Sequence, residues 1–170
     1  MEFDIEQTDE LLSTTRAVRL RLDLERDVPD DLLLRCIELA EQAPTGAGVS
    51  SRRWLVIRDQ ETKSRLAELY REAGGSRMID RSQERGRAEG LQDRVADSAA
   101  HLAANLEKVP VLVLATIWGV HDGSGRPGLF DSVIQAAWSF CLALRARGLG
   151  SAWTTLHLGK AKEFAELLGI

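Results

Sequence analysis

The pattern of apolar and polar positions along the chain predicts a helix-rich protein with three strands. Apolar residues recur at helical spacing in about six segments, separated by polar turns. Start signals accompany this spacing, because Pro29 and the acids after it suit a first helical turn, and Asp59 is placed to cap the next helix. The helical segments are residues 8–12, 28–43, 59–74, 95–107, 131–147 and 160–168.

The most apolar segment, residues 131–157, is the one around which we expect the rest to pack. Asp131 is placed as an N-cap, and apolar side chains then cover almost the whole helical circumference, which predicts a mostly buried helix. Gly148 suits the left-handed position after the last turn. Residues 151–158 alternate loosely and predict an inward strand whose tip carries Thr154, Thr155, Leu156 and His157.

Two other segments read as strands. Trp54–Ile57 is a short apolar run, and Val111–Trp118 is a continuous one, typical of a strand buried on both faces. With residues 151–158 they make three strands, which is few for a stable sheet beside so much helix. The sequence therefore predicts a further strand, supplied by a partner chain or by sequence not present here.

Two segments carry little hydrophobic signal. Residues 75–94 are dominated by charges with few apolar anchors, which indicates solvated, weak helices. Such a segment is consistent with a mobile lid and equally with an exposed helical excursion. Residues 119–128 form a Gly-rich loop without the Gly-Lys-Ser/Thr ending of a Walker loop.

Composition restricts the class of protein. The chain is 44% hydrophobic and 28% charged with a net charge of −4, as in soluble globular proteins, which argues against nucleic acid or a membrane surface as partner. The N-terminus lacks an apolar signal core and no apolar run approaches about 20 residues, so a cytoplasmic protein is expected. Cys36 and Cys141 lie in helical patterns and are expected to be buried thiols, with a disulfide as the alternative.

No catalytic constellation stands out in the sequence. The three histidines are far apart, and zinc motifs, a nucleophile elbow and a completed dinucleotide fingerprint are missing. Three groups of hydroxyl and arginine side chains together could hold a phosphorylated planar cofactor. Taken alone, Arg16 and Arg19 are also consistent with a solvated edge, and His157 with a satisfied strand end. The groups are Thr14, Thr15, Arg16 and Arg19; Thr45, Ser50, Ser51, Arg52 and Arg53; and Thr154 to His157.

The order of five motifs resembles the nitroreductase family of FMN-dependent oxidoreductases, most closely an actinobacterial subgroup. Thr15–Arg19 resembles the family's Arg-Arg-Ser-x-Arg start, and Ala43–Gly46 its Ala-Pro-Ser/Thr-Gly loop. Trp54–Ile57 and Val109–Val113 are similar to the two strands that follow, and Gly148–His157 to the Gly-Leu-Gly turn and the flavin-facing strand. The resemblance spans residues 8–170, which we interpret as a single nitroreductase-like domain over residues 1–170.

The resemblance implies an α+β fold with a central, mostly antiparallel sheet flanked by helices, and a homodimer with two FMN molecules at its interface. NAD(P)H would reduce the flavin, and a small acceptor such as a nitroaromatic or quinone would reoxidise it. Arg16 would lie near the phosphate, Arg19 near flavin N1 and O2, and residues 44–46 would approach from the partner subunit. Residues 154–156 would lie near N5, and no protein acid or base is required. The cofactor-binding set is Thr15, Arg16, Ala17, Val18, Arg19, Pro44, Thr45, Gly46, Thr154, Thr155 and Leu156.

The sequence departs from the family pattern in two places. The family's Asn-x-Gln-x-Trp run is replaced by a longer loop, residues 47–54, with neither amide; Ser50, Ser51 and Arg52 are the candidate substitutes. The chain also ends at Ile170, where we expect the family's last strand and dimer arm to be absent. These departures leave two alternatives to an active enzyme: a flavin-sequestering protein with little turnover, or a relic without cofactor.

Overall fold

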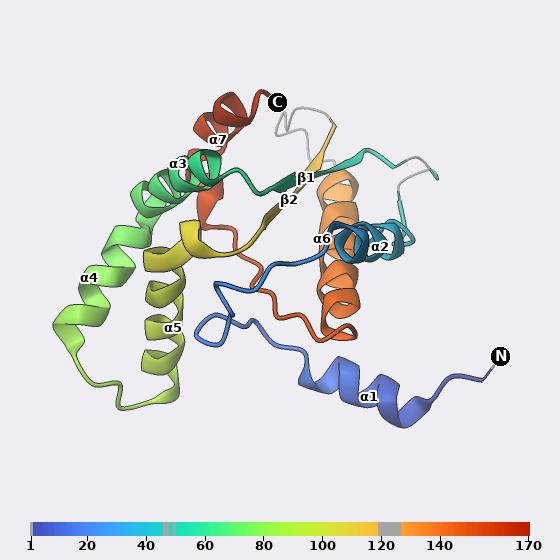
Figure 1. Ribbon diagram of the computed structural model, residues 1–170, viewed down its shortest axis with the longest axis horizontal. Helices are drawn as coiled ribbons and strands as arrows, with labels where there is room; N and C mark the ends of the chain where they lie inside the picture. Colours follow the sequence, from blue (N-terminus) through green and yellow to red (C-terminus); the bar gives the residue numbers. More distant parts are fainter. Residues whose placement is uncertain (1, 46–47, 49, 119–126) are drawn as a thin grey trace. The chain divides into compact units, whose positions relative to one another are not determined.

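The computed structural model describes the backbone of residues 2–45, 48, 50–118 and 127–170 (Figure 1). It contains two compact units, each assembled from segments that are distant in the sequence. The first unit consists of Met1–Ala17, Asp27–Val56 and Val113–Trp153. The second consists of Val18–Arg26, Ile57–Leu112 and Thr154–Ile170.

Each unit has its own set of elements. The first holds α1 (Ile5–Thr14), α2 (Asp30–Ala40), α6 (Pro127–Arg145) and most of the strands β1 (Arg52–Ile57) and β2 (Leu112–Ile117). The second holds α3 (Gln60–Tyr70), the π-helical turn η2 (Arg71–Gly75), α4 (Ser76–Arg85), α5 (Leu91–Asn105), η3 (Leu106–Lys108), η4 (Leu156–Lys160) and α7 (Ala161–Leu168).

The sheet of the described residues has two strands, β1 and β2, rather than the three that the sequence predicts. The pairing is antiparallel, because the Trp118 amide donates to the Ser51 carbonyl at 2.6 Å and the Thr116 hydroxyl to the Arg53 carbonyl at 3.1 Å. The prediction of β2 as a strand is confirmed, but its residues are half-buried on both faces rather than fully buried.

The strand predicted over residues 151–158 is wrong. Residues 151–155 are irregular, and residues 156–160 form the 3-10 helix η4. The Thr155 carbonyl accepts a hydrogen bond from the Leu158 amide at 3.0 Å, which closes a turn and is incompatible with an extended strand. Loose alternation over a few residues is a weak strand signal when no neighbouring strand supplies a ladder.

The first unit is built around α6, which packs against α2 (Figure 1). The helix begins at Pro127, so the expectation that Asp131 caps it is wrong. Proline is favoured at the first position of a helix, which suits a start four residues before Asp131. Trp54 of β1 packs on Phe140 of α6, with ring centroids 5.2 Å apart. The core residues of this unit are Leu33, Cys36, Ala40, Ala136, Ala137, Phe140, Ala143 and Leu144.

The buried face of α6 covers only part of its circumference. Ile134 and Trp138, one turn apart, are 49% and 43% exposed, so the prediction of a helix buried all round is only partly confirmed. The C-terminal end agrees with expectation, because Gly148 has φ 75°. Of the Gly-rich loop predicted over residues 119–128, residues 119–126 lie outside the described part, and the last two are helical.

The second unit buries α3 against η3 and α7. Asp59 caps α3 as predicted, since its carboxylate accepts from the Thr62 amide at 2.7 Å. Lys63 is buried on this helix, and its ammonium donates to the Val109 carbonyl at 2.8 Å, which fixes the entry to β2. The core residues are Ile57, Leu66, Ala67, Tyr70, Ala100, Leu102, Ala103, Leu106, Val109 and Phe164.

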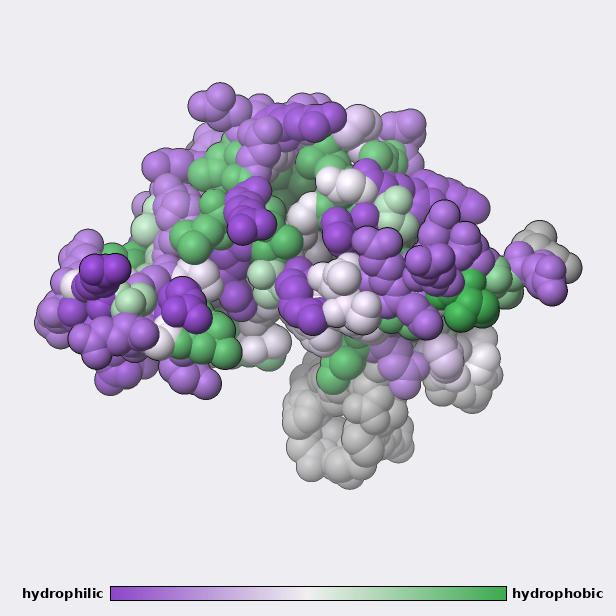
Figure 2. Space-filling view, turned by 90° about the horizontal axis from the view of Figure 1, so that it is seen from below, coloured by the Kyte–Doolittle hydropathy of each residue, from purple (hydrophilic) through white to green (hydrophobic). Residues whose placement is uncertain are grey.

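The charged segment predicted to contain weak helices forms a hairpin of α4 and the start of α5. Polar contacts hold it together, because Ser82 donates to Asp97 at 2.6 Å and Arg85 pairs with both Asp93 and Asp97. None of the α4 side chains is buried. Hydrophilic side chains cover most of this hairpin, at the left of Figure 2. The interpretation as a lid remains a prediction.

Both cysteines are free thiols, as expected. Cys36 is buried in α2, and burial raises its pKa despite the opposing charge of Arg147. Cys141 is half-buried, and burial raises its pKa although a hydrogen bond with Ser151 opposes the shift. In the described residues no helix combines the length and the apolar character that a membrane span requires.

We expect Leu66→Ala to destabilise the protein by about 2–5 kcal/mol, because it opens a cavity at a side chain that is only 2% exposed. Leu91→Ala makes the same chemical change at a position that is 66% exposed and is expected to stay within about 0.5 kcal/mol of the parent. Urea unfolding of both variants measures the difference. Equal losses would show that Leu66 is not a core residue.

Candidate functional site

The predicted cofactor-binding residues are divided between the two units. Thr15, Arg16, Ala17, Pro44 and Thr45 belong to the first unit. Val18, Arg19, Thr154, Thr155 and Leu156 belong to the second. Gly46 lies outside the described residues.

In the first unit, the end of α1 presents Arg16. The Thr15 hydroxyl and amide both donate to the Leu11 carbonyl, at 2.5 and 3.2 Å, so this buried side chain terminates the helix. Arg16 is exposed, and one of its Nη1 hydrogens donates to the Thr15 carbonyl at 2.7 Å. Ala17 is exposed as well. Thr15 therefore has a structural role at the end of α1, and the Arg16 cation lies at the surface beside it.

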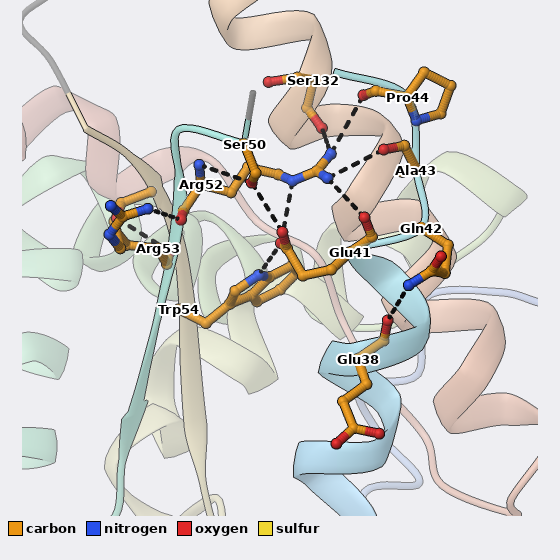
Figure 3. A network of polar contacts seen from close by, with 11 residues as sticks. Glu38, Glu41, Gln42, Ala43, Pro44, Ser50, Arg52, Arg53, Trp54 and Ser132 are labelled. Carbon is orange, nitrogen blue, oxygen red and sulfur yellow. Dashed lines mark hydrogen bonds and ion pairs between the residues drawn. The ribbon is translucent and has the colours of Figure 1, made fainter. Parts of the chain in front are cut away.

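The Pro44–Thr45 loop is held by a polar network around Arg52 (Figure 3). The Arg52 guanidinium donates to the Glu41 carboxylate at 3.1 Å and to backbone carbonyls of the loop. Ser50 donates to the same carboxylate at 2.8 Å. Ser50 and Arg52, proposed from the sequence as substitutes for the missing amides, are therefore bonded within the protein.

Glu41 is the anion at the centre of this network. Burial opposes its ionisation, but hydrogen bonds from Trp54 and Ser50 and the charge of Arg52 together lower its pKa. The Trp54 indole N–H donates to the Glu41 carboxylate at 2.7 Å. The carboxylate is thus ionised in the folded protein at neutral pH, where it compensates the buried guanidinium.

In the second unit, Arg19 is half-buried and points one Nη1 hydrogen at the Ser98 hydroxyl of α5, with the nitrogen 3.4 Å from the oxygen. That distance is long for a hydrogen bond, so the contact is weak. Within the described residues this is the one hydrogen bond of the Arg19 side chain. Most of its donors are therefore available to an anion or a carbonyl acceptor.

The segment with Thr154 and Leu156 is fixed by α3 and η2. The Thr154 and Tyr70 hydroxyl oxygens are 2.7 Å apart, and Tyr70 is buried in the core. Leu156 lies so near Gly74 that a Cβ there would be 3.3 Å from its Cδ1; Gly74 has φ 139°, which disfavours other residues. Thr155 is exposed at the start of η4.

His157 is held against a ring rather than by a charge. Its imidazole lies 5.2 Å from the Phe164 ring, and burial lowers its pKa. A neutral histidine packed on an aromatic ring agrees with the structural role that the sequence analysis allowed for His157. In the described part of the chain no three His, Cys, Asp or Glu side chains gather closely enough to hold a metal ion.

The sequence interpretation missed three contributors to these loops: Glu41, Tyr70 and Ser132, whose carbonyl accepts from Arg52 at 3.1 Å. A signal existed for Glu41. Arg52 and Trp54 alternate on one face of a strand, and a buried arginine requires an anion, which the acid just after the preceding helix can supply. For Tyr70 and Ser132 no local signal existed, because their contacts cross long sequence separations.

Comparisons with known proteins give the following results. The model of the nitroreductase family matches residues 12–170. The chain resembles a BluB-like flavoprotein from Clostridium difficile 630 (TM-score 0.68, 20% identity, 98% of this chain and 81% of that chain). It also resembles the FMN-dependent nitroreductase NfnB from Mycobacterium smegmatis, solved with NADPH (TM-score 0.69, 18% identity, 98% of this chain and 83% of that chain).

A third similar structure is oxidized iodotyrosine deiodinase bound to FMN and 3-iodo-L-tyrosine (TM-score 0.66, 21% identity, 93% of this chain and 79% of that chain). At these identities the likeness concerns the fold. No curated protein sequence shows a significant match to the chain.

The half-buried, uncharged state of His157 predicts a pH dependence of stability. Its folded pKa lies below the ordinary value of 6.5, so the unfolded chain binds the proton more readily. The stabilisation is present above that ordinary pKa and is lost as the pH falls below it. We expect the free energy of unfolding to decrease from pH 7.5 to pH 5, and to decrease less in His157→Gln. Identical pH profiles for the two proteins would contradict this account.

Proposed function

This chain belongs to the nitroreductase family, and on that premise we propose that it is an FMN-dependent oxidoreductase that passes electrons from NAD(P)H to a small acceptor such as a nitroaromatic or a quinone. The observation that carries the proposal is the family match over residues 12–170. The fold agrees, since it is the helix-rich nitroreductase-like fold with a small antiparallel sheet. FMN is present in a similar nitroreductase structure from Desulfitobacterium hafniense DCB-2.

The proposed FMN-binding residues are Thr15, Arg16, Ala17, Val18, Arg19, Pro44, Thr45, Gly46, Thr154, Thr155 and Leu156. Their donor chemistry fits the cofactor. Arg16 is an exposed cation suited to a phosphate, and Arg19 has donors to spare for the pyrimidine oxygens of the flavin. A cation there also stabilises the anionic reduced flavin. When bound, FMN supplies the hydride and electron chemistry, and the protein binds and orients it.

The proposed assembly is a cytoplasmic homodimer. Support comes from α6, where Ile134 and Trp138 form an apolar stripe that this chain leaves about half exposed. Contiguous apolar surface on a charged protein commonly marks an interface. A second copy of the chain is the occupant that the family implies. In that arrangement residues 44–46 would serve the partner's flavin.

The direct test is a titration of the purified full chain with FMN, followed by NAD(P)H under anaerobic conditions. We expect micromolar or tighter binding, about −8 kcal/mol, then bleaching of the flavin absorption and multiple turnovers with a quinone. No binding would contradict the proposal. Tight binding without oxidation of either nucleotide would indicate a flavin-sequestering protein instead, as the altered loop of residues 47–53 allows.

Arg19→Ala is expected to weaken FMN binding by about 1.5–3 kcal/mol, because it removes a charged hydrogen bond. Arg26→Ala, an exposed arginine of the same unit, is the matched control and should leave the affinity unchanged. Calorimetric titration of both variants measures the effect. Equal affinities for Arg19→Ala and the parent would make Arg19 an ordinary surface residue.

A further inference from the structure

Arg52 is a charged residue at the start of β1 that is only 4% exposed. A guanidinium has five N–H donors, and here all five are used within the protein. The acceptors and distances are Glu41 Oε1 from Nε (3.1 Å), the Glu41 and Ala43 carbonyls from Nη2 (3.0 and 3.1 Å), and the Pro44 and Ser132 carbonyls from Nη1 (3.4 and 3.1 Å).

Three of the four carbonyls belong to one short stretch after α2, residues 41–44. Without the guanidinium these part-buried carbonyls would converge on one point with no donor, which is unfavourable. Figure 3 shows the carbonyls directed at the guanidinium. Their convergence therefore depends on Arg52. The fourth carbonyl, of Ser132, ties the same group to α6.

The carboxylate of Glu41 makes this burial of charge possible. It accepts from Arg52, Trp54 and Ser50, three residues of β1 and the segment before it. Removing one partner of such a pair leaves the other charge uncompensated. Arg52 and Glu41 thus form a unit that holds the end of α2 against the start of β1.

The network also sets the direction of one peptide group. In a trans peptide the C=O and N–H point in opposite directions. The Pro44 carbonyl faces the guanidinium, so the Thr45 N–H faces away from it. A backbone donor is thereby presented on the side of the loop opposite to Arg52.

We propose that Arg52, paired with Glu41, is a positioning residue that fixes the backbone of residues 43–45 for flavin binding and does not itself contact the cofactor. This inference rests on the proposed function, in which Pro44 and Thr45 approach FMN. It assigns Arg52 a role different from that of Arg16 and Arg19, each of which makes a single side-chain hydrogen bond within the described residues.

The test compares Arg52→Lys with Arg35→Lys in the full chain. Lysine keeps the charge but cannot reach four carbonyls and a carboxylate together. Arg35 of the same unit is exposed on α2 and pairs with the Glu38 carboxylate at 2.9 Å, so it is the matched control. Two quantities are measured: hydrogen–deuterium exchange of residues 41–45 without FMN, and FMN affinity by titration.

We expect Arg52→Lys to accelerate exchange of the Gln42 and Ala43 amides, and to weaken FMN binding about tenfold or more. At saturating FMN its turnover with NAD(P)H should stay within about twofold of the parent. Arg35→Lys should change none of these. If Arg52→Lys does not fold, Glu41→Gln carries the same test, since it removes the compensating charge and keeps the side-chain shape.

Two outcomes would overturn the inference. Weaker FMN binding with unchanged exchange would mean that Arg52 contacts the cofactor directly. Faster exchange with unchanged FMN affinity would mean that the loop does not serve the flavin. Failure of the parent to bind FMN would overturn the proposed function together with the cofactor role of the loop, whereas the exchange measurement would still decide whether Arg52 anchors it.

Discussion

A buried guanidinium must find acceptors for all of its N–H groups, and this requirement determines where three segments of the first unit meet. Arg52 donates hydrogen bonds to backbone carbonyls after α2 and in α6, and the Glu41 carboxylate supplies the opposite charge. Burying a charge without such compensation is costly. The loop that carries Pro44 and Thr45 is consequently ordered by β1, and any ligand that uses this loop depends on the ion pair.

Much of the fold follows from the sequence because the signals are local. The spacing of apolar residues and the start signals at Pro29 and Asp59 place the beginnings of α2 and α3 correctly, whereas both helices end earlier than predicted, at Ala40 and Tyr70. The signals fail where the outcome depends on distant neighbours. Residues 151–158 alternate like a strand but form an irregular segment and a 3-10 helix, because Thr154 bonds to Tyr70 and no strand of the described chain pairs with them.

The candidate site shows the same division between local and distant information. Arg16 and Arg19 can be chosen from the sequence because their residue type suggests anion binding. Their difference from Arg52 is invisible there, since it depends on which carbonyls surround each guanidinium. The structure separates them. Arg52 uses every donor within the protein, while within the described residues the Arg19 side chain makes one long contact, with Ser98. Arg52 lies in the stretch where the sequence departs from the Asn-x-Gln-x-Trp pattern. There its guanidinium bonds the backbone carbonyls of residues 41, 43 and 44.

The measurement that tests this account most directly is a crystal structure of the protein grown with FMN. The account predicts flavin bound against the loop of Pro44 and Thr45, with the Arg52 guanidinium still bonded to Glu41 and to the carbonyls of residues 41–44. A structure with FMN in which Arg52 turns onto the cofactor, or one in which saturating FMN leaves these residues without flavin, would contradict it.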